Sequence, residues 1–367
     1  MTSVNEETMS EYRDHLCVTS VRQYLILCGG DGRDSAYDYN DLWSYNTING
    51  VWKQFEIPIE LGDSRIHHRL VVDGNLVYIL SAESVDDDVL QIISLVSFDV
   101  SNAKFDTLYT LPFDSDDDTL PPMVLSLFFS HNGSMYVMGS PNREDDDEDE
   151  DDDEDEDEGD DDVEVIYKFC QATSTWEVVP QNGTTPHFVG NQYSTVYKNQ
   201  LYVLEDRGFV SNRFREVWIL DFLTMCWSRR DTMSKDLQYP VDRIHESYAF
   251  SSNAAYMSGG MNEDMSATFS DIWRMDFETL EWTKLNYSFQ TGAYGHYLSV
   301  MDDGFLINFD GHVHKEGCLN KFERLTILPP SLIRLSLESV CRSPNMSDRL
   351  MLLPPSVVDN LNLNNDN

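Results

Sequence analysis

The sequence predicts an all-β protein assembled from a repeated unit of about 50 residues. Five times along the chain, a short apolar strand is followed by an aromatic residue that closes a β-hairpin. The long interval between these aromatics contains a run from Glu144 to Asp162 in which 18 of 19 residues are acidic, and the interval is 52 residues without it. A strand-only repeat of this length predicts a β-propeller. The five hairpin aromatics, separated by 53, 71, 51 and 55 residues, are Trp52, Phe105, Trp176, Trp227 and Trp282.

The first and fifth units show the same order of elements. In the first unit an apolar strand over residues 24–28 leads to the glycine pair Gly29-Gly30, and a second strand over residues 41–45 precedes a turn and Trp52. Alternating apolar and polar residues between Gly, Asn and Asp indicate strands and hairpins. The glycine pair predicts a close approach of the backbone where neighbouring blades crowd the central axis. The matching landmarks of the fifth unit are residues 255–258, Gly259-Gly260, residues 271–275 and Trp282.

The other units are less regular. A sixth unit begins at His296, continues through strands over residues 305–309 and 322–326, and lacks its Trp. Six units therefore occupy residues 12–328, and residues 1–11 are expected to be a flexible N-terminus. In the irregular units the glycine pair is replaced by Ser81-Ala82, Gly139-Ser140, Glu205-Asp206 and Asp310-Gly311.

A glycine pair, an Asp-Leu-Trp or Asp-Ile-Trp strand and a following Trp together resemble the kelch repeat. This resemblance implies a six-bladed kelch β-propeller. With 367 residues, of which 41% are hydrophobic and 12% aromatic, the chain can bury the large core that such a ring needs.

Composition also bears on the cellular setting. The chain has no apolar stretch of 18 residues, and its N-terminus is polar and acidic, unlike a signal peptide. Six cysteines are scattered without a C-x-x-C motif, and several fall inside strand patterns, which favours buried free thiols in a reducing compartment. We expect a cytoplasmic or nuclear protein that is not attached to a membrane.

The formal net charge of −40 argues against direct binding to nucleic acid or to anionic membranes. The acidic run over residues 144–162 supplies 18 of these charges. Because such a run repels itself and cannot fold, we expect a disordered loop inserted in the third blade. The run is interpreted either as an expanded surface loop or as a docking segment for basic partners such as histones or ribosomal proteins.

A second internal repeat is the triplet Arg-x-His, which begins at Arg13, Arg65 and Arg243. Each triplet stands just ahead of a strand that leads to the glycine-pair position, so repeat symmetry places the arginines near the mouth of the central channel. A guanidinium group is a planar fork suited to bidentate binding of a carboxylate. The three arginines are therefore candidates for binding a substrate carboxylate. Alternatively, each orders a loop by pairing with a nearby aspartate, such as Asp14, Asp63 or Asp242.

The chain continues beyond the propeller with a predicted helical segment over residues 329–361. After two prolines, Ser331 is a predicted N-cap, and the apolar residues at positions 332, 333, 335, 337 and 340 predict an amphipathic helix. A second apolar patch lies between residues 349 and 361, and residues 362–367 are expected to be a disordered tail. Helices outside a closed propeller either dock back on it or present a hydrophobic face to a partner.

The first helix resembles an elongin-binding BC box, in which a small residue and Leu are followed at fixed spacing by Cys and an aliphatic residue. In one register the matching residues are Ser331, Leu332, Ser336 and Val340, with Ser in the place of Cys. In the other register Ser336, Leu337 and Cys341 match, but Asn345 occupies the aliphatic place. A segment similar to a cullin-2 box follows, with matching residues Leu353, Pro354, Val357 and Leu361.

These motifs, in this order after a propeller, resemble the kelch substrate receptors of cullin-2 ubiquitin ligases. The resemblance favours the register that begins at Ser331, and it implies a non-catalytic adaptor without a cofactor. Such an adaptor grips the C-terminal carboxylate of a target protein, here through Arg13, Arg65 and Arg243. The residues implied to enter elongin C of the elongin B/C pair are Leu332, Leu335 and Val340. Those implied to contact cullin-2 are Leu353, Pro354 and Val357.

Other functions have less support in the sequence. It contains no G-x-S-x-G, P-loop or H-E-x-x-H motif, and His312 and His314 have no third metal ligand at a suitable spacing, so neither an enzyme nor a metal site is expected. Two binding alternatives stay open: a kelch scaffold whose C-terminal helices brace the propeller, and an acidic loop that binds basic proteins. Burial of Leu332, Leu335 and Leu353 against the blades favours the scaffold, and their exposure favours the adaptor.

Overall fold

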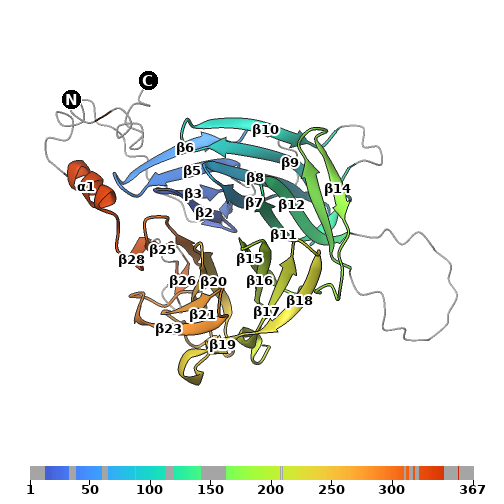
Figure 1. Ribbon diagram of the computed structural model, residues 1–367. Helices are drawn as coiled ribbons and strands as arrows, with labels where there is room; N and C mark the ends of the chain where they lie inside the picture. Colours follow the sequence, from blue (N-terminus) through green and yellow to red (C-terminus); the bar gives the residue numbers. More distant parts are fainter. Residues whose placement is uncertain are drawn as a thin grey trace.

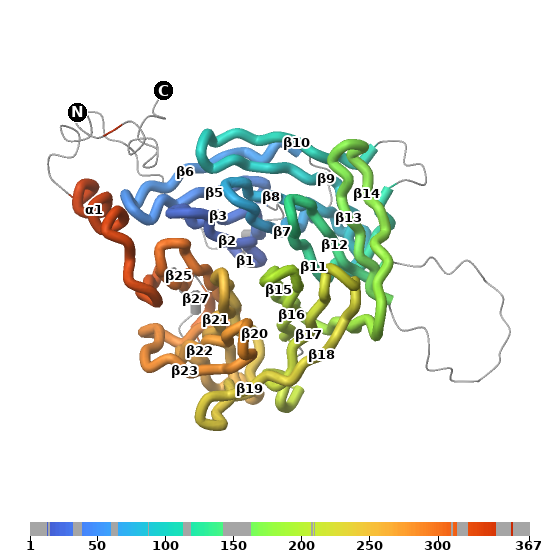
Figure 2. Tube along the Cα trace, viewed as in Figure 1, coloured from blue at the N-terminus to red at the C-terminus, as the bar shows by residue number. Residues whose placement is uncertain are grey.

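In the computed structural model, six sheets stand as blades around a central axis (Figures 1 and 2). The blades follow one another in chain order, so each one forms from one repeat. The prediction of an all-β, six-bladed propeller with a short C-terminal helix is confirmed. The structure describes residues 13–32, 39–59, 65–86, 88–112, 119–141, 163–206, 208, 210–309, 311–313, 317–318, 322–342 and 354.

Blades 1, 2 and 3 each contain four antiparallel strands that follow one another from the axis outward. Blade 1 consists of β2 (Cys17–Val21), β3 (Tyr24–Cys28), β5 (Asp41–Asn46) and β6 (Val51–Glu56). Blade 2 consists of β7 (Ile66–Asp73), β8 (Leu76–Ser84), β9 (Leu90–Asp99) and β10 (Lys104–Thr110). Blade 3 consists of β11 (Met123–His131), β12 (Ser134–Pro141), β13 (Val165–Cys170) and β14 (Thr175–Val179). One residue pair, Met123 with Leu90, joins the sheets of blades 2 and 3.

Blades 4 and 5 repeat this arrangement, whereas blade 6 has three described strands. Blade 4 consists of β15 (Asn191–Tyr197), β16 (Gln200–Asp206), β17 (Glu216–Asp221) and β18 (Cys226–Asp231). Blade 5 consists of β20 (Ile244–Phe250), β21 (Ala254–Met261), β22 (Asp271–Asp276) and β23 (Glu281–Ser288), with β19 (Met233–Ser234) parallel to β23. Blade 6 consists of β24 (Tyr297–Val300), β25 (Phe305–Phe309) and β28 (Phe322–Thr326).

Short elements complete the ring. Two-residue strands pair on the connections of blades 1 and 6, two 3-10 helices flank blades 4 and 5, and α1 (Leu332–Cys341) follows blade 6. The short elements are β1 (Arg13–Asp14), β4 (Asp31–Gly32), β26 (His312–Val313), β27 (Gly317–Cys318), η1 (Arg213–Arg215) and η2 (Lys235–Leu237).

The connections of the blades fall on two opposite faces of the ring, because neighbouring strands alternate in direction. The loop face carries the connections between the second and third strands of a blade and those between blades. The hairpin face carries the turns between first and second strands and between third and fourth strands. β12 ends and β13 begins on the loop face, where the acidic run 144–162 is inserted; that run lies outside the described residues. β28 ends on the hairpin face, and α1 follows there.

The hairpin aromatics pack each blade against the preceding one. Trp282 of blade 5 is fully buried, meets the Phe214 ring of blade 4 edge-on with 6.0 Å between ring centroids, and donates its indole N–H to the Phe214 carbonyl at 2.9 Å. Trp52 of blade 1 lies 6.3 Å from Phe309 of blade 6. Edge-on and tilted aromatic pairs of this kind add to the free energy gained from burial alone. The aromatic residue thus recurs in the sequence because it packs each blade against its neighbour.

The glycine pair of blades 1 and 5 makes room for a histidine of the next blade. A Cβ atom at Gly29 would lie 2.4 Å from His68 Cδ2, and one at Gly259 would lie 2.0 Å from His296 Cε1. His68 belongs to β7 of blade 2, and His296 directly precedes β24 of blade 6. Both glycines also have left-handed backbones, with φ of +69° and +72°. The close approach predicted at the glycine pair is present, and its partner is a histidine ring.

We expect Gly259→Ala to lower the free energy of unfolding by about 3 kcal/mol, since the left-handed φ costs about 1 kcal/mol and the clash with His296 adds about 2 kcal/mol. Chemical denaturation of both proteins measures the loss. The matched control is Gly133→Ala, because Gly133 has φ +73° but a Cβ atom added there would meet nothing within 4 Å. Equal losses in the two variants would show that the histidine contact contributes nothing.

Candidate functional site

Arg243, a candidate for carboxylate binding, is completely buried inside blade 5. Its Nη1 donates hydrogen bonds to the carbonyl of Gly259 at 3.1 Å and to Asp271 at 2.7 Å, and its guanidinium lies over the Phe269 ring at 3.9 Å. Asp271 also accepts a hydrogen bond from Trp273 Nε1 at 2.9 Å. Burial raises the pKa of Asp271, but the hydrogen bond and charge of Arg243 outweigh it, and the pKa falls to about 2.

Arg13 makes the same contacts in blade 1. Its Nη1 donates to the carbonyl of Gly29 at 3.1 Å, its Nη2 donates to Asp41 at 2.9 Å, and its guanidinium lies over the Tyr39 ring at 3.6 Å. Trp43 Nε1 again donates to the aspartate at 2.9 Å. In both blades the glycine lies 16 residues after the arginine and the aspartate 28 residues after it. The network is a repeated structural unit that fixes the Asp-Leu-Trp or Asp-Ile-Trp strand.

These contacts leave neither guanidinium available to a ligand, since only 5% of Arg13 and 0% of Arg243 are exposed. The two arginines therefore do not form the predicted carboxylate pocket. The alternative of pairing within the chain describes them better. Their partners are Asp41 and Asp271, at the start of the third strand, and not the aspartates nearest in sequence.

Arg65 differs from the other two candidates because its side chain is exposed. It directly precedes β7 on the loop face. The residue 28 positions further along is Ile93, so the aspartate that fixes Arg13 and Arg243 has no counterpart in blade 2. Arg65 is thus the one candidate arginine of the three that presents its guanidinium to solvent.

A third buried arginine, which no sequence pattern indicated, joins blades 4 and 5. Arg213 donates from Nη1 to the carbonyl of Glu205 at 2.7 Å and from Nη2 to the carbonyl of Arg243. The same Nη2 lies 2.6 Å from Glu246 and 3.9 Å from Asp206. Glu205 occupies the glycine-pair position of blade 4, so Arg213 reaches the equivalent carbonyl from a different loop. Only the fold brings this arginine to that place.

The seam between the first and last blades is closed by side chains. Among the described strands, those of blade 1 form no β ladder with those of blade 6. The Tyr45 and Phe322 rings meet edge-on across the seam, with 5.2 Å between centroids. Three hydrogen bonds also cross it: Leu16 N to Tyr297 Oη at 2.8 Å, Ser20 Oγ to the Val300 carbonyl at 2.6 Å, and Arg22 N to Asp302 Oδ2 at 3.1 Å.

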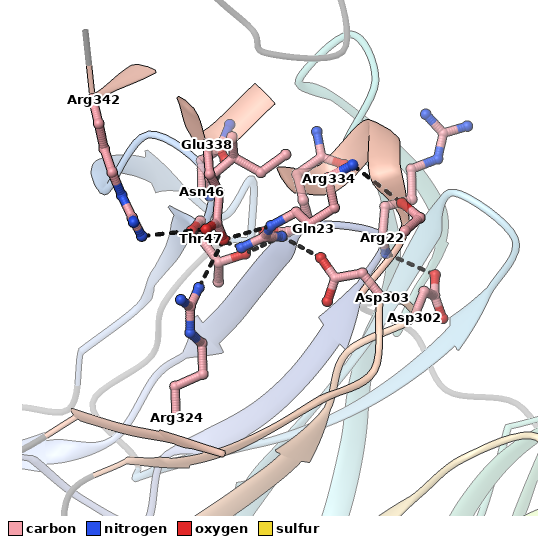
Figure 3. A network of polar contacts seen from close by, with 12 residues as sticks. Arg22, Gln23, Asn46, Thr47, Asp302, Asp303, Arg324, Arg334, Glu338 and Arg342 are labelled. Atoms are coloured by element: carbon pink, nitrogen blue, oxygen red, sulfur yellow. Dashed lines mark hydrogen bonds and ion pairs between the residues drawn. The ribbon is translucent and has the colours of Figure 1, made fainter. Parts of the chain in front are cut away.

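Helix α1 covers this seam on the hairpin face through Arg334, which is 3% exposed (Figure 3). Arg334 donates from Nη1 to Thr47 Oγ1 at 3.0 Å and from Nη2 to the Thr47 carbonyl at 2.9 Å. It also forms an ion pair with Asp303. Thr47 lies in the β5–β6 turn of blade 1, and Asp303 lies in the β24–β25 turn of blade 6. One guanidinium therefore connects the helix to both ends of the ring.

Glu338, one helical turn after Arg334, is the second buried polar residue of α1. Its carboxylate accepts hydrogen bonds from Arg334 Nε at 2.8 Å, from Arg324 of β28 at 3.0 Å and from Arg342 at 3.2 Å (Figure 3). Burial raises the pKa of Glu338, but the hydrogen bond and charge of Arg334 outweigh it and the pKa is lowered. The helix thus docks on the propeller with its charged residues.

The apolar residues in the first turn of α1 face solvent. Leu332 is 81% exposed, Ile333 73% and Leu335 46%. Ser336 is also exposed, and Val340 is half-buried. The predicted N-cap is confirmed, because Ser331 Oγ accepts a hydrogen bond from Arg334 N at 3.1 Å.

The other predicted partner residues are described only in part. In the second BC-box register, Leu337 and Cys341 are half-buried and Asn345 lies outside the described residues. In the cullin-box segment Pro354 is exposed. The remaining residues of that segment, Leu353, Val357 and Leu361, lie outside the described residues.

The described residues offer no membrane span and no metal cluster. No helix in the described part of the chain is long and apolar enough to cross a membrane. No three histidine, cysteine or carboxylate side chains within the described ranges are arranged to hold a metal ion. The cysteines with described side chains are free thiols: Cys17, Cys28, Cys170, Cys226 and Cys341.

Comparison with known proteins agrees with this architecture. The family described as KLHDC2/KLHL20/DRC7 Kelch-repeats domain matches residues 152–322. Together with the six blades, this match supports a β-propeller fold of the kelch type. Kelch domain-containing protein 10 of rat and of human are each 20% identical to the chain over 335 residues, which cover 87% of this chain and 74% and 69% of the relatives. A solved structure titled "Structure of YjhT" has a TM-score of 0.55 and 12% identity, and the match covers 87% of this chain and 96% of that one.

The buried pair of Arg213 and Glu246 predicts a pH dependence of stability. Burial raises the pKa of Glu246, Arg213 lowers it, Asp206 raises it again, and the result is about 7. This pKa lies above the pKa of a glutamate in the unfolded chain. The contribution of Glu246 to the stability of the fold is therefore complete below about pH 4.5 and is lost as pH rises through about 7. We expect Glu246→Gln to remove this dependence, which amounts to about 3 kcal/mol between pH 4.5 and 8. Urea unfolding of both proteins across that range measures it.

An equal pH slope in wild type and Glu246→Gln would contradict this assignment. The control is Glu177→Gln, at an exposed glutamate of β14, which should leave the slope as it is in wild type.

We expect Arg334→Ala to destabilise the propeller by about 3–5 kcal/mol, because it leaves Asp303 and Glu338 partly buried without their principal counter-charge. Arg342→Ala is the matched control, since that side chain is 72% exposed and contacts the same Glu338, and its loss should be below about 1 kcal/mol. Thermal and urea unfolding measure both. Similar stabilities of the two variants would show that α1 does not close the ring.

Proposed function

We propose that the protein is the substrate-recognition subunit of a cullin-2–elongin B/C ubiquitin ligase, without catalytic activity of its own. A kelch propeller is a scaffold for protein–protein interaction, which fits the receptor half of this role. In the proposal the propeller holds a target protein, and α1 and the segment after it hold elongin C and cullin-2. Ubiquitin transfer belongs to other subunits. A reducing compartment, cytoplasmic or nuclear, suits the free thiols.

The observation that carries the proposal is the inverted polarity of α1. A helix on the surface of a globular protein normally turns its apolar stripe to the core. Here Arg334 and Glu338 face the propeller, whereas Leu332 is 81% exposed. Exposed apolar side chains gathered on one element mark a surface that a partner covers. This is the outcome that favours an adaptor over a purely bracing helix.

The geometry of α1 also supports one BC-box register. Residues 332, 336 and 340 lie four apart and share one face of the helix, while 334 and 338 lie about 200° around it. The buried face is therefore opposite the face that the Ser331 register presents. By the same geometry, residues 337 and 341 of the alternative register lie nearer the buried face than residues 332 and 336 do.

Target binding is proposed on the loop face, away from α1. Arg65 lies there with an exposed side chain, and we propose it as the arginine that contributes to binding a C-terminal carboxylate. Arg13 and Arg243 have no part in the proposed site because their guanidinium groups are buried in ion pairs. The loop face and the hairpin face then serve different partners.

One observation favours the scaffold alternative. Arg334 ties α1 to Thr47 and Asp303, so the helix does brace the ring as well as expose its leucines. A kelch scaffold without a ligase role is the second candidate. The alternative that the acidic run binds basic proteins concerns residues outside the described part of the chain.

We expect Leu332→Asp to abolish capture of purified elongin B/C while the circular dichroism of the propeller stays unchanged, because a charge enters an apolar pocket only at a cost of several kcal/mol. The matched control is Leu223→Asp, since Leu223 is 85% exposed in the β17–β18 turn of the same hairpin face. A pull-down with elongins and cullin-2 measures both. Capture that survives Leu332→Asp refutes the register, and a wild-type protein that captures no elongin leaves the scaffold function.

A further inference from the structure

Within the described ranges, blade 6 has no outer strand of the kind that the other five blades have. In blades 1–5 the third strand pairs on its outer side with a fourth strand. The third strand of blade 6 is β28, and among the described residues only β25 pairs with it. An unpaired strand edge presents free backbone N–H and C=O groups that pair with any suitable extended segment.

A cavity of about 370 Å³ opens beside this edge, between blade 6, blade 1 and the end of α1. β28 contributes Phe322 and Arg324, blade 1 contributes Tyr45 and the β5–β6 turn, and α1 contributes Cys341 with Arg342 after it. Phe322 is 38% exposed. The lining contains the guanidinium groups of Arg324 and Arg342 and no carboxylate, although both groups also donate hydrogen bonds to Glu338 of α1. On a chain with a net charge of −40, this is a local site suited to an acidic side chain.

The complete blades define what an occupant of the edge looks like. The aromatic of each fourth strand stands opposite a fixed position of the third strand, as Trp282 stands opposite Met275 and Trp176 opposite Phe169. The equivalent position of β28 is Leu325, which pairs with Leu306 as Met275 pairs with Ala255. An added strand would therefore place an aromatic opposite Leu325.

In blade 3 the residue next to that aromatic is acidic, whereas in blade 5 it is Thr283, opposite Arg274. Glu177 directly follows Trp176 and stands opposite Lys168. In β28 the position equivalent to Lys168 is Arg324. An aromatic residue followed by an acidic one thus matches β28 by both packing and charge.

The two ends of this chain do not carry that pattern. Residues 1–12 contain one aromatic residue, Tyr12, which directly precedes Arg13 of blade 1. In the complete blades the outer-strand aromatic lies further from the arginine that begins the next blade: Trp52 precedes Arg65 by 13 residues, and Trp227 precedes Arg243 by 16. Residues 343–367 contain no aromatic residue.

We propose that β28 and the cavity beside it form a strand-addition site for a partner protein, which inserts an extended segment with an aromatic-acidic dipeptide as the fourth strand of blade 6. The aromatic packs against Leu325, and the acidic side chain pairs with Arg324 and Arg342. Backbone hydrogen bonds along the edge supply affinity, and the dipeptide supplies selectivity. The site is separate from the apolar face of α1 and does not depend on a ligase role.

The test uses the full chain and a fluorescein-labelled peptide of residues 173–180, Thr-Ser-Thr-Trp-Glu-Val-Val-Pro, which reproduces β14. Fluorescence anisotropy should show saturable binding in the micromolar range. Replacing the peptide's Glu177 by Lys should weaken it about tenfold, and Arg324→Glu in the protein should weaken binding of the natural peptide to a similar degree. The Lys peptide should bind the Arg324→Glu protein better than it binds wild type, which a merely misfolded variant would not do.

Arg69→Glu, at an exposed arginine of blade 2, is the matched control and should leave binding unchanged. No saturable binding, or binding that ignores both charge changes, overturns the proposal. Binding that appears only after deletion of residues 1–12 also overturns it, because the chain itself would then fill the edge.

Discussion

The ring depends on the seam where its last blade meets its first. Within a blade, hydrogen-bonded strands hold the structure together, whereas among the described strands neighbouring blades share no ladder apart from the Met123–Leu90 pair, and blades 1 and 6 are not consecutive in the chain either. Side chains must therefore supply the contacts that close the ring. The buried guanidinium of Arg334 supplies such a contact, because it reaches Thr47 of blade 1 and Asp303 of blade 6. A buried charge is stable only while its partners stay in place. Helix α1 is therefore part of the closed ring and not an independent tail.

The same contacts account for the direction in which α1 faces. Turning the helix to bury Leu332 would take Arg334 and Glu338 away from their partners and leave Asp303 without a counter-charge in a partly buried site. The cost of an unpaired buried charge exceeds the gain from burying one leucine, which is about 1.5–3 kcal/mol. The chain thus keeps apolar side chains in solvent because ring closure takes precedence. A partner that covers these leucines gains apolar burial without disturbing the seam.

The fold followed from features that repeat locally. Strand alternation and the spacing of aromatics such as Trp282 recur around the ring, and the Gly259-Gly260 pair has a counterpart in blade 1, so a single sequence reveals them. The role of Arg243 could not be predicted from the sequence, because its partner Asp271 lies 28 residues away and other aspartates lie closer in the sequence. The equal spacing of 28 residues between arginine and aspartate in blades 1 and 5 could have indicated this pairing. Arg213 and the docking of Arg334 had no such signal, since Arg213 has partners in blade 5 as well as in its own blade, and Arg334 has partners in blades 1 and 6.

The arrangement of faces sets how partners combine on this ring. Arg65 and the insertion point of the acidic run lie on the loop face, and α1 lies on the hairpin face, so under the proposed function a target and a ligase subunit would meet different surfaces. The edge of β28 is the exception, because Arg324 contacts both the cavity and Glu338 of α1. An acidic side chain that enters the cavity competes with Glu338 for Arg324, while Arg334 keeps the helix in place. Strand addition at blade 6 would therefore change the charge balance under α1 without opening the ring.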